Sequence, residues 1–330
     1  MHLVHRRAHV PHMMSLGRAT LSREGGLVAM GRHCASAMRA QSTSKFGVVG
    51  CGQMGIGIGI VAARHAELEV HAYDFPQSLE RGRKFVTSWA AKEVSKARMT
   101  EEESSIFMSR FNFAAFDDSK ALGAVQQLDF VVEAVTEDQS VKQAVYSKLQ
   151  EAGLSETAIL ATNTSSISIT KLASTVKRPE RVIGMHFMNP VPVMPLVEVI
   201  CGLQTSEATL TETLSLCSRM KKEHATSQDR PGFVANRILM PYINEAIFTL
   251  QEGIATAEDI DKTMKLGTNV PMGPLTLADF IGLDTCLSIM RVLHRDFGDS
   301  KYRPSPLLVN YVEAGWLGKK TGRGFYSYNK

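Results

Sequence analysis

Seven apolar, largely β-branched runs of five or six residues recur through the first two thirds of the 330-residue chain. They cover residues 46–50, 68–73, 111–116, 130–134, 158–162, 182–187 and 196–201. Several are separated by helical spacing, as in 140–152, where Val141, Val145 and Leu149 share one face. Apolar strands that alternate with helices predict an α/β fold, a mostly parallel sheet covered on both faces. The last two runs lie closer together, which predicts an antiparallel edge.

The pattern changes near residue 230. Pro231 suits a helix start, apolar residues then follow at helical spacing, and Gly253 would stop that helix. Thr256 to Asp259 is a capping signal for a helix that ends at Gly267, and a further apolar helix runs through Leu293. We therefore expect a first domain over residues 45–229 and an all-helical second domain over residues 230–330.

A glycine turn follows the first apolar run. Gly50 would permit the tight turn, Gly52 would let the backbone approach a pyrophosphate, and Gly55 would let the next helix pack on the strand. Asp74 ends the second run, nineteen residues after Gly55. There a carboxylate would bind the adenosine ribose and repel a 2′-phosphate. The pattern predicts a doubly wound, Rossmann-type domain that binds NAD rather than NADP; an ordinary glycine-rich loop is the alternative. The turn consists of Gly50, Cys51, Gly52, Gln53, Met54 and Gly55.

A candidate catalytic pair lies in the last two runs. His186 comes near the end of one predicted strand, three prolines bend the chain, and the next strand brings back Glu198. A carboxylate beside the imidazole would fix its tautomer, as a general base needs when it removes a hydroxyl proton during hydride transfer. The alternative is a core histidine bonded to a backbone carbonyl, with Glu198 solvated.

Two further polar residues are candidates for contact with a substrate. Ser165 directly follows a predicted strand and could orient a substrate oxygen or the nicotinamide ribose, although hydroxyls in that place often cap a helix. Asn236 stands among apolar neighbours in a predicted helix. Its amide could bind a substrate carbonyl or bridge two helices.

The net charge of +4 comes from the first 44 residues, which hold six arginines, no lysine and one acidic residue. The remainder holds 31 basic and 32 acidic residues, a balance that gives no electrostatic footprint for nucleic acid. An arginine-rich, acid-poor leader predicts a mitochondrial transit peptide over residues 1–44 and a matrix location. The alternatives are a disordered extension or a mis-assigned start, with Met30 or Met38 as later candidates, and a cytoplasmic location.

The five cysteines show no paired metal spacing, so we expect no metal. Cys51, Cys201, Cys217 and Cys286 are interpreted as small buried side chains. The one stretch long enough to suggest a membrane span, residues 46–63, is the glycine turn and its helix. We therefore expect no membrane segment.

The chain resembles the L-3-hydroxyacyl-CoA dehydrogenase family, including its 3-hydroxybutyryl-CoA relatives, from about Lys45 to the C-terminus. The resemblance implies reversible NAD-dependent oxidation of L-3-hydroxyacyl-CoA to 3-oxoacyl-CoA, in fatty-acid β-oxidation or short-chain acyl-CoA metabolism, by a homodimer joined through its helical domains. A sugar-acid dehydrogenase and a non-catalytic NAD-binding protein are the rivals. Seven blocks carry the resemblance, at residues 48–57, 132–137, 163–166, 186–198, 231–237, 271–274 and 318–326.

The resemblance also implies roles for individual residues. His186 would be the base and Glu198 its partner, with Ser165 and Asn236 at the substrate. Four positions match cofactor contacts, although without the family the first two would be a helix-surface pair and the last a tail charge. These are Glu137, Lys142, Asn189 and Lys320.

A basic cluster follows the second strand, where the family places a helical arm against coenzyme A. Lys96 is the best single candidate there, and a solvated helix face is the alternative. The chain departs from the family pattern at Cys51, at Gly59 and at Pro195, where a lysine is common. The cluster consists of Arg81, Arg83, Lys84, Lys92, Lys96 and Arg98.

Overall fold

The computed structural model describes residues 43–118 and 121–328, so the predicted leader lies outside the described residues except for its last two positions. Apolar runs form an eight-stranded sheet in the order β3-β2-β1-β4-β5-β6-β7-β8. All neighbouring strands are parallel except β6 and β7, which are antiparallel as expected. The strands are β1 Lys45–Val49, β2 Glu69–Asp74, β3 Phe111–Ala115, β4 Phe130–Glu133, β5 Ile159–Thr162, β6 Val182–Phe187, β7 Leu196–Cys201 and β8 Glu223–Gln228.

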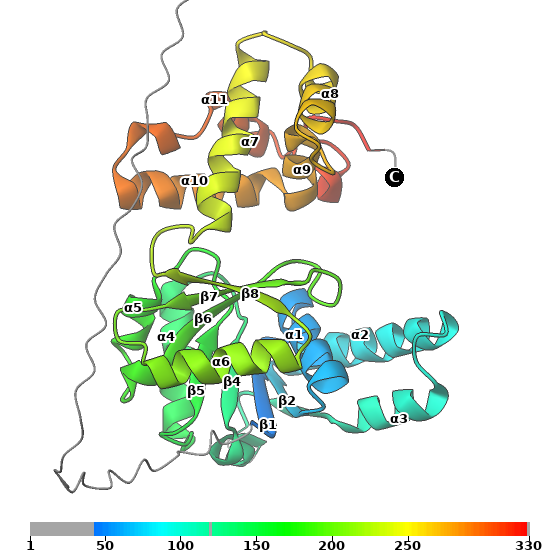
Figure 1. Cartoon of the computed structure of the whole chain (residues 1–330), viewed down its shortest axis with the longest axis vertical. Coiled ribbons are helices and arrows are strands. Elements are labelled where there is room, and N and C mark those ends of the chain that lie inside the picture. The colour runs from blue at the N-terminus through cyan, green and yellow to red at the C-terminus, as the bar shows by residue number, and fades with distance from the viewer. Residues whose placement is uncertain (1–42, 119–120, 329–330) are drawn as a thin grey trace, which may run out of the picture. The chain divides into compact units, whose positions relative to one another are not determined.

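Helices cover both faces of this sheet (Figure 1). One face packs against α1 (Gln53–His65), α2 (Pro76–Ser95) and α6 (Glu207–Arg219), with Ile58, Val86 and Leu216 in its core. The other packs against η1 (Ala121–Gln127), α4 (Gln139–Glu151) and α5 (Ile169–Ala173), with Leu149 and Leu172 buried. Near-continuous apolar strands suit such a sheet because each strand is buried from two sides.

Beyond the sheet, α2 and α3 (Glu101–Ser109) form a helical hairpin. The C-terminal elements have a separate apolar core that includes Ile247, Leu275 and Leu287. They are α7 Ala235–Gln251, α8 Ala257–Gly267, α9 Pro274–Ile281, α10 Leu283–Phe297, α11 Pro306–Glu313 and the short turns η3 Ser300–Tyr302 and η4 Lys319–Thr321. A further short turn, η2 Pro179–Arg181, precedes β6.

Buried aspartates hold the last segment of the chain on this helical core. Asp279 accepts hydrogen bonds from the backbone N–H groups of Phe325 and Tyr326, both at 3.0 Å. Asp261 accepts a 2.9 Å bond from the Tyr326 hydroxyl and 2.8 Å bonds from the N–H groups of Leu275 and Thr276 in α9. Part of the 318–326 block is therefore structural.

Three details of the predicted elements were wrong. The strand β8 was not predicted, because its sequence is polar and mostly exposed at the sheet edge. Pro231 does not begin a helix: Gly232 and Phe233 adopt positive φ angles of 73° and 50°, and α7 starts at Ala235. The expected single helix through Leu293 is two helices, because Gly282, with φ of 104°, separates α9 from α10.

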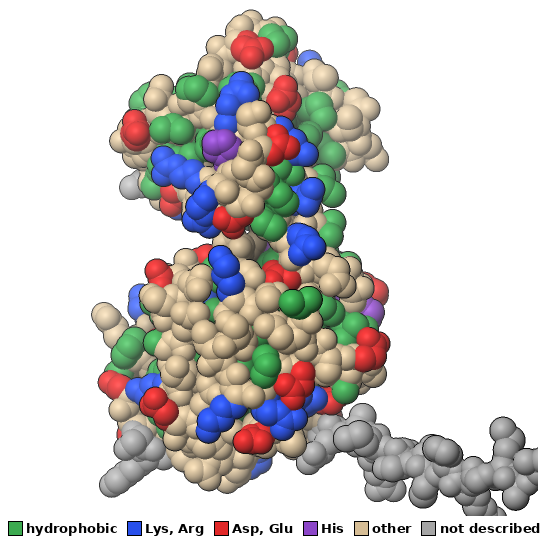
Figure 2. All heavy atoms as spheres, turned by 90° about the vertical axis from the view of Figure 1, so that its left-hand side faces the viewer, with side chains coloured by type: hydrophobic (Ala, Val, Ile, Leu, Met, Phe, Trp, Pro, Cys, Tyr) green, Lys and Arg blue, Asp and Glu red, His purple; other side chains and the backbone are tan. Residues whose placement is uncertain are grey.

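Charged side chains of both signs are interspersed over the face shown in Figure 2. Within residues 43–118 and 121–328, no helix is long and apolar enough to cross a membrane. Cys51, Cys217 and Cys286 are buried as expected, whereas Cys201 is half-buried.

Candidate active site

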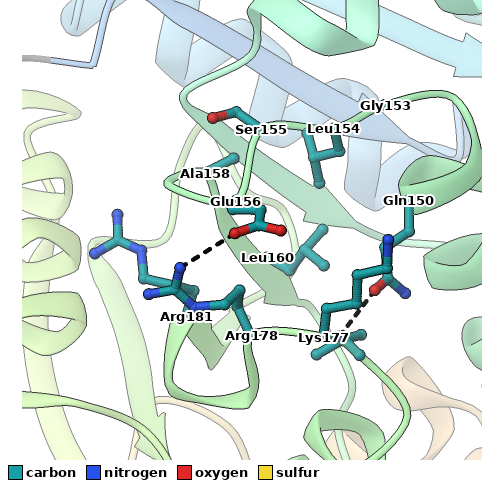
Figure 3. A pocket seen from close by; sticks show the side chains of 11 residues that line it. Gln150, Gly153, Leu154, Ser155, Glu156, Ala158, Leu160, Lys177, Arg178 and Arg181 are labelled. Carbon is teal, nitrogen blue, oxygen red and sulfur yellow. Dashed lines mark hydrogen bonds and ion pairs between the residues drawn. The ribbon is translucent and has the colours of Figure 1, made fainter.

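The two ends of the parallel strands carry different features. At the amino end of β5 and β6 a pocket is lined by Gln150, Glu156, Lys177 and Arg178, among others (Figure 3). Its polar groups bond one another: the Lys177 N–H donates to Gln150 at 2.9 Å, and Arg178 pairs with Glu156 at 3.5 Å. None of the predicted site residues lines it. The cofactor turn and the predicted reaction-centre residues gather instead at the carboxyl end, where ligands bind in open α/β sheets.

The glycine turn has the geometry of a phosphate cradle. Gly50 has a φ of 103°, which other residues rarely adopt, and its N–H donates to the Tyr73 carbonyl at 2.8 Å. A Cβ on Gly55 would lie 1.8 Å from the Gly50 oxygen, so helix and strand meet too closely for any side chain. A Cβ on Gly52 would meet no atom within 4 Å. The open side of the turn, at the start of α1, thus fits a dinucleotide pyrophosphate.

Asp74 lies beside this turn at the end of β2. Its Oδ2 accepts a hydrogen bond from the Cys51 N–H at 2.6 Å, and its Oδ1 accepts one from the Phe75 N–H at 2.7 Å. Each carboxylate oxygen keeps capacity for further donors such as ribose hydroxyls. On the other side of the turn, the Gln53 amide donates to Asn189 at 2.9 Å. Asn189 belongs to the loop between β6 and β7, so that loop is tied to the cofactor turn.

His186 and Glu198 face each other across the antiparallel pair β6 and β7. Their Nδ1 and Oε2 atoms are 2.7 Å apart, and the side chains are 12% and 3% exposed. The other carboxylate oxygen of Glu198 accepts hydrogen bonds from the N–H groups of Val234 at 3.1 Å and Ala235 at 2.9 Å. The predicted pair is therefore in contact, and the start of α7 holds its acid.

These contacts keep Glu198 charged. Burial opposes ionisation, but the hydrogen bonds from His186, Ala235 and Val234 outweigh it, so the pKa of the Glu198 carboxyl is lowered. A charged acceptor at Nδ1 assigns the imidazole proton to that nitrogen. Nε2 then has a lone pair that can accept a proton.

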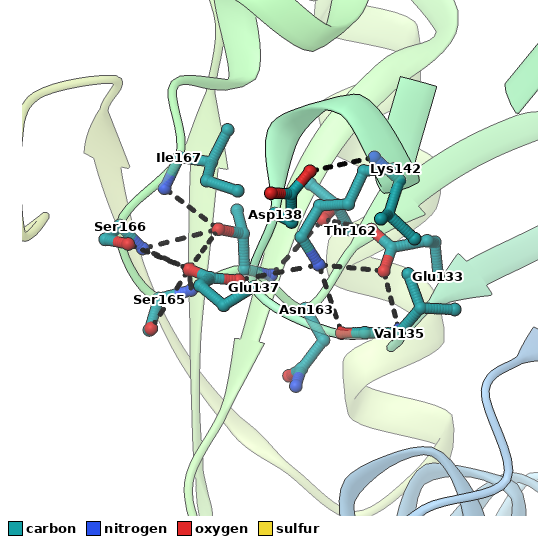
Figure 4. Close-up of polar contacts among 12 residues, drawn as sticks. Glu133, Val135, Glu137, Asp138, Lys142, Thr162, Asn163, Ser165, Ser166 and Ile167 are labelled. Carbon is teal, nitrogen blue, oxygen red and sulfur yellow. Dashed lines mark hydrogen bonds and ion pairs between the residues drawn. The ribbon is translucent and has the colours of Figure 1, made fainter. Parts of the chain in front are cut away.

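Ser165, Glu137 and Asn236 lie together next to this pair. The Ser165 N–H and hydroxyl donate to Glu137 Oε1 at 2.9 and 3.1 Å (Figure 4). The Asn236 amide donates to the Ser165 carbonyl at 3.3 Å. Asn236 directly follows Ala235, one of the amide donors to Glu198. The structure thus brings together the four predicted reaction-centre residues, from the turn after β5 and from β6, β7 and α7.

The remaining predicted contacts fall in different places. Lys142 is 1% exposed and pairs with Glu133 at 2.8 Å, so the alternative of a helix-surface pair was wrong for it. Lys320 is exposed and bonds Asp284 at 2.6 Å. Lys96 is exposed at the end of α2, in the helical hairpin. The contacts of all three with ligands stay predictions.

Two buried charged residues near the site did not stand out in the sequence. Lys222 is buried, and its Nζ donates to the carbonyls of Val191 at 2.5 Å and Met194 at 2.7 Å, inside the proline-rich β6–β7 loop. Burial lowers the pKa of the Lys222 ammonium. Glu133 is fully buried at the end of β4. Glu133 could have been found as a candidate because it is an acidic residue at the end of an apolar run. Lys222 stands between polar residues, and nothing in the sequence indicated that it would be buried.

A carboxylate-bound imidazole beside a dinucleotide turn is the arrangement of a dehydrogenase that oxidises an alcohol. Residues 45–230 match the model of the 3-hydroxyacyl-CoA dehydrogenase NAD-binding domain, and residues 232–328 match the C-terminal domain of the same enzymes. The chain belongs to the 3-hydroxyacyl-CoA dehydrogenase family. The predicted fold, family and cofactor, NAD, are confirmed.

Individual relatives agree with this assignment. The chain is 51% identical to a probable 3-hydroxybutyryl-CoA dehydrogenase of Bacillus subtilis, over 86% of this chain and 96% of that protein. It is 38% identical to the mitochondrial hydroxyacyl-coenzyme A dehydrogenase of Rattus norvegicus, over 85% and 90% of the two chains. The crystal structure of (S)-3-hydroxybutyryl-CoA dehydrogenase from Ralstonia eutropha is similar with a TM-score of 0.83 and 44% identity, covering 87% of this chain and all of that one.

Proposed function

We propose that this chain is an NAD-dependent L-3-hydroxyacyl-CoA dehydrogenase of short-chain acyl-CoA or fatty-acid metabolism. The contact between His186 and Glu198, 2.7 Å apart at the carboxyl end of a dinucleotide-binding sheet, is the observation that carries the proposal. The 51% identity to a probable 3-hydroxybutyryl-CoA dehydrogenase supports the substrate class.

In this proposal His186 acts as a general base. The Nδ1–H group of the ring donates a hydrogen bond to Glu198, and the ring accepts the 3-hydroxyl proton at Nε2. The positive charge that results on the imidazole is stabilised by the Glu198 carboxylate. NAD supplies the acceptor for the hydride that leaves C3. The products are a 3-oxoacyl-CoA, NADH and a proton that His186 returns to solvent; reduction reverses each step.

Ser165 and Asn236 would hold the substrate oxygen while its charge changes. Both already lie in one hydrogen-bonded group, so little reorganisation is needed for them to act together. Asp74 and the turn 50–55 would bind the dinucleotide, as would Glu137, Lys142, Asn189 and Lys320. Lys96 on the helical hairpin would bind the coenzyme A phosphates.

An assay with two substrates tests the activity. Purified protein is mixed with NADH and acetoacetyl-CoA, and NADH loss is followed by the absorbance of the reduced nicotinamide. A parallel reaction contains L-gulonate and NAD. We expect turnover in the first alone; turnover only in the second would replace the substrate class.

A substitution tests the base. His186→Gln should bind NADH as the wild type does and lose about 10²- to 10⁴-fold in kcat, because the amide cannot accept the proton. Steady-state rates and an NADH fluorescence titration measure the two effects. A variant that kept most of its activity would exclude His186 as the base.

Location and assembly are further proposals. We infer a mitochondrial matrix protein with a transit peptide over residues 1–44, supported by the arginine content of that segment and by the mitochondrial relative from rat. A fluorescent reporter fused to residues 1–44 tests it, and diffuse cytosolic signal would contradict it.

A domain boundary near residue 230 and a homodimer joined by the helical domains complete the proposal. Light scattering should give twice the mass of one chain.

A further inference from the structure

A buried ion pair lies under the turn that presents Ser165 (Figure 4). Glu133 ends β4 with no exposed surface, and Lys142 lies in the first turns of α4 with 1% of its side chain exposed. Besides the Lys142 ammonium, Glu133 accepts hydrogen bonds from the Thr162 hydroxyl and the Val135 N–H, both at 2.7 Å. One carboxylate therefore joins the ends of two strands to a helix.

Lys142 connects this pair to Glu137. Its Nζ lies 3.5 Å from Glu137 Oε2, at the partly exposed side of the network. Partial burial opposes ionisation of Glu137, but the Lys142 charge and the hydrogen bonds from the 164–166 turn lower the pKa of its carboxyl. Lys142 thus lies between two acids, one fully buried and one at the site.

The other oxygen of Glu137 organises the Ser165 turn. Oε1 accepts from the Thr164 hydroxyl at 2.6 Å and from the N–H groups of Ser165 and Ser166 at 2.9 Å. The hydroxyls of both serines also lie within 3.1 Å of it. Five donors exceed the lone pairs of one carboxylate oxygen, so the Ser165 hydroxyl can exchange this contact for a ligand oxygen while the amides keep the turn fixed.

Stability alone does not account for the buried pair. Moving an ammonium and a carboxylate out of water costs several kcal/mol per ion, and apolar replacements of such pairs are often as stable. The pair lies at the carboxyl edge of the sheet, and Lys142 is linked to Ser165 through Glu137. Its position relates it to the geometry of the site rather than to the apolar core.

We propose that Glu133 is a positioning residue for the dehydrogenase reaction: it holds Lys142 in place, so that Glu137 keeps the Ser165 turn in its reactive position. The proposal rests on the proposed function. Without the Glu133 charge, the Lys142 ammonium turns toward Glu137 and draws that carboxylate away from the turn. Glu133 itself touches the network and not the reacting atoms.

Glu133→Gln tests this against a matched control at the other end of the same strand. Asp129, just before β4, bonds the N–H groups of Ser44 and Lys45, and Asp129→Asn makes the same acid-to-amide change there. We expect Glu133→Gln to lose about 10- to 100-fold in kcat, because small displacements of reacting groups cost that much. Its KM for acetoacetyl-CoA should change by less than about threefold. Asp129→Asn should keep both constants within about twofold.

A double-mutant cycle tests the route through Lys142. If Glu133 acts by holding Lys142, the variant with both Glu133→Gln and Lys142→Met loses no more kcat than Lys142→Met alone. Losses that multiply would overturn the coupling. The doubly neutral variant also covers the case in which Glu133→Gln fails to fold, since it leaves no unpaired buried charge.

NADH affinity separates this proposal from the proposed function. Fluorescence titration should show Glu133→Gln binding NADH about 3- to 10-fold more weakly than wild type, because Glu137 is at the predicted cofactor site. If wild type fails to reduce acetoacetyl-CoA, the function is wrong and the titration still tests the positioning role. If wild type is active while Glu133→Gln matches it in kcat and NADH affinity, the positioning role is wrong.

Discussion

At the scale of single residues, the site depends on how one carboxylate is held. Glu198 uses one oxygen for His186 and the other for the N–H groups of Val234 and Ala235. The same atoms therefore set the imidazole tautomer and fasten the start of α7 to β7. Catalysis and stability are linked at this residue.

That link predicts a pH-dependent stability. The Glu198 pKa is lowered from its ordinary value of 4.5, so its stabilising effect is fully present above pH 4.5 and is lost as pH falls through the folded-state pKa. Glu198→Gln should lower the unfolding free energy by about 2 kcal/mol at neutral pH. Urea unfolding at neutral and acidic pH should show the difference from wild type shrinking in acid.

An exposed acid provides the control for that experiment. Glu156 is 68% exposed and meets Arg178 at 3.5 Å, a surface contact of little energetic value. Glu156→Gln should leave unfolding unchanged at both pH values. A Glu198→Gln deficit that persisted in acid would mean that the loss comes from packing rather than from charge.

At the scale of elements, two glycines of the turn have different roles, Gly55 in helix packing and Gly52 in cofactor binding. Gly55→Ala places a methyl group 1.8 Å from the Gly50 oxygen, so α1 must move away from β1. We expect a loss of about 3 kcal/mol or more in stability and weak NADH binding. Gly52→Ala meets no atom of the protein, so it should fold normally and bind NADH weakly. Thermal unfolding and NADH titration of both variants distinguish the two effects.

The β6–β7 loop depends on a buried lysine in the same way. Lys222 satisfies two carbonyls of a loop in which prolines remove N–H donors, and the loop carries Asn189 toward Gln53. Lys222→Met should reduce kcat/KM by about tenfold, since it leaves both carbonyls without a partner. Lys221→Met is the control, because Lys221 is exposed. Equal activity of the two variants would show that the loop holds its shape without Lys222.

At the scale of the whole molecule, the sheet and the helical segment meet through the site itself. Asn236 bonds Ser165, and the two residues before it bond Glu198. The chain therefore completes its reaction centre only when α7 is joined to β7 and to the turn after β5. The site therefore needs residues from both of the matched domains.

Cofactor binding should be visible in global stability. NADH at 100 times its Kd should raise the unfolding free energy by about 2.7 kcal/mol, because it binds only the folded state. Thermal scans with and without NADH measure the shift, and the Gly52→Ala variant should lose most of it at the same concentration. An equal shift in that variant would indicate binding away from the glycine turn.

The sequence by itself determined the local elements and the local chemistry. Apolar runs gave seven of the eight strands, and the glycine spacing with Asp74 gave the cofactor turn, because those patterns act within one βαβ unit. It did not give β8, whose polar sequence becomes a strand only because β7 offers an unpaired edge.

The tertiary structure alone decided how distant residues combine. The register of β6 and β7 sets His186 opposite Glu198, and the α7 start brings two amides to that acid. It also made Lys142 a buried partner of Glu133, whereas without the family resemblance the sequence suggested a surface charge. Such contacts join residues far apart in the chain, and their energies depend on burial, which exists only once the sheet and its helices have packed.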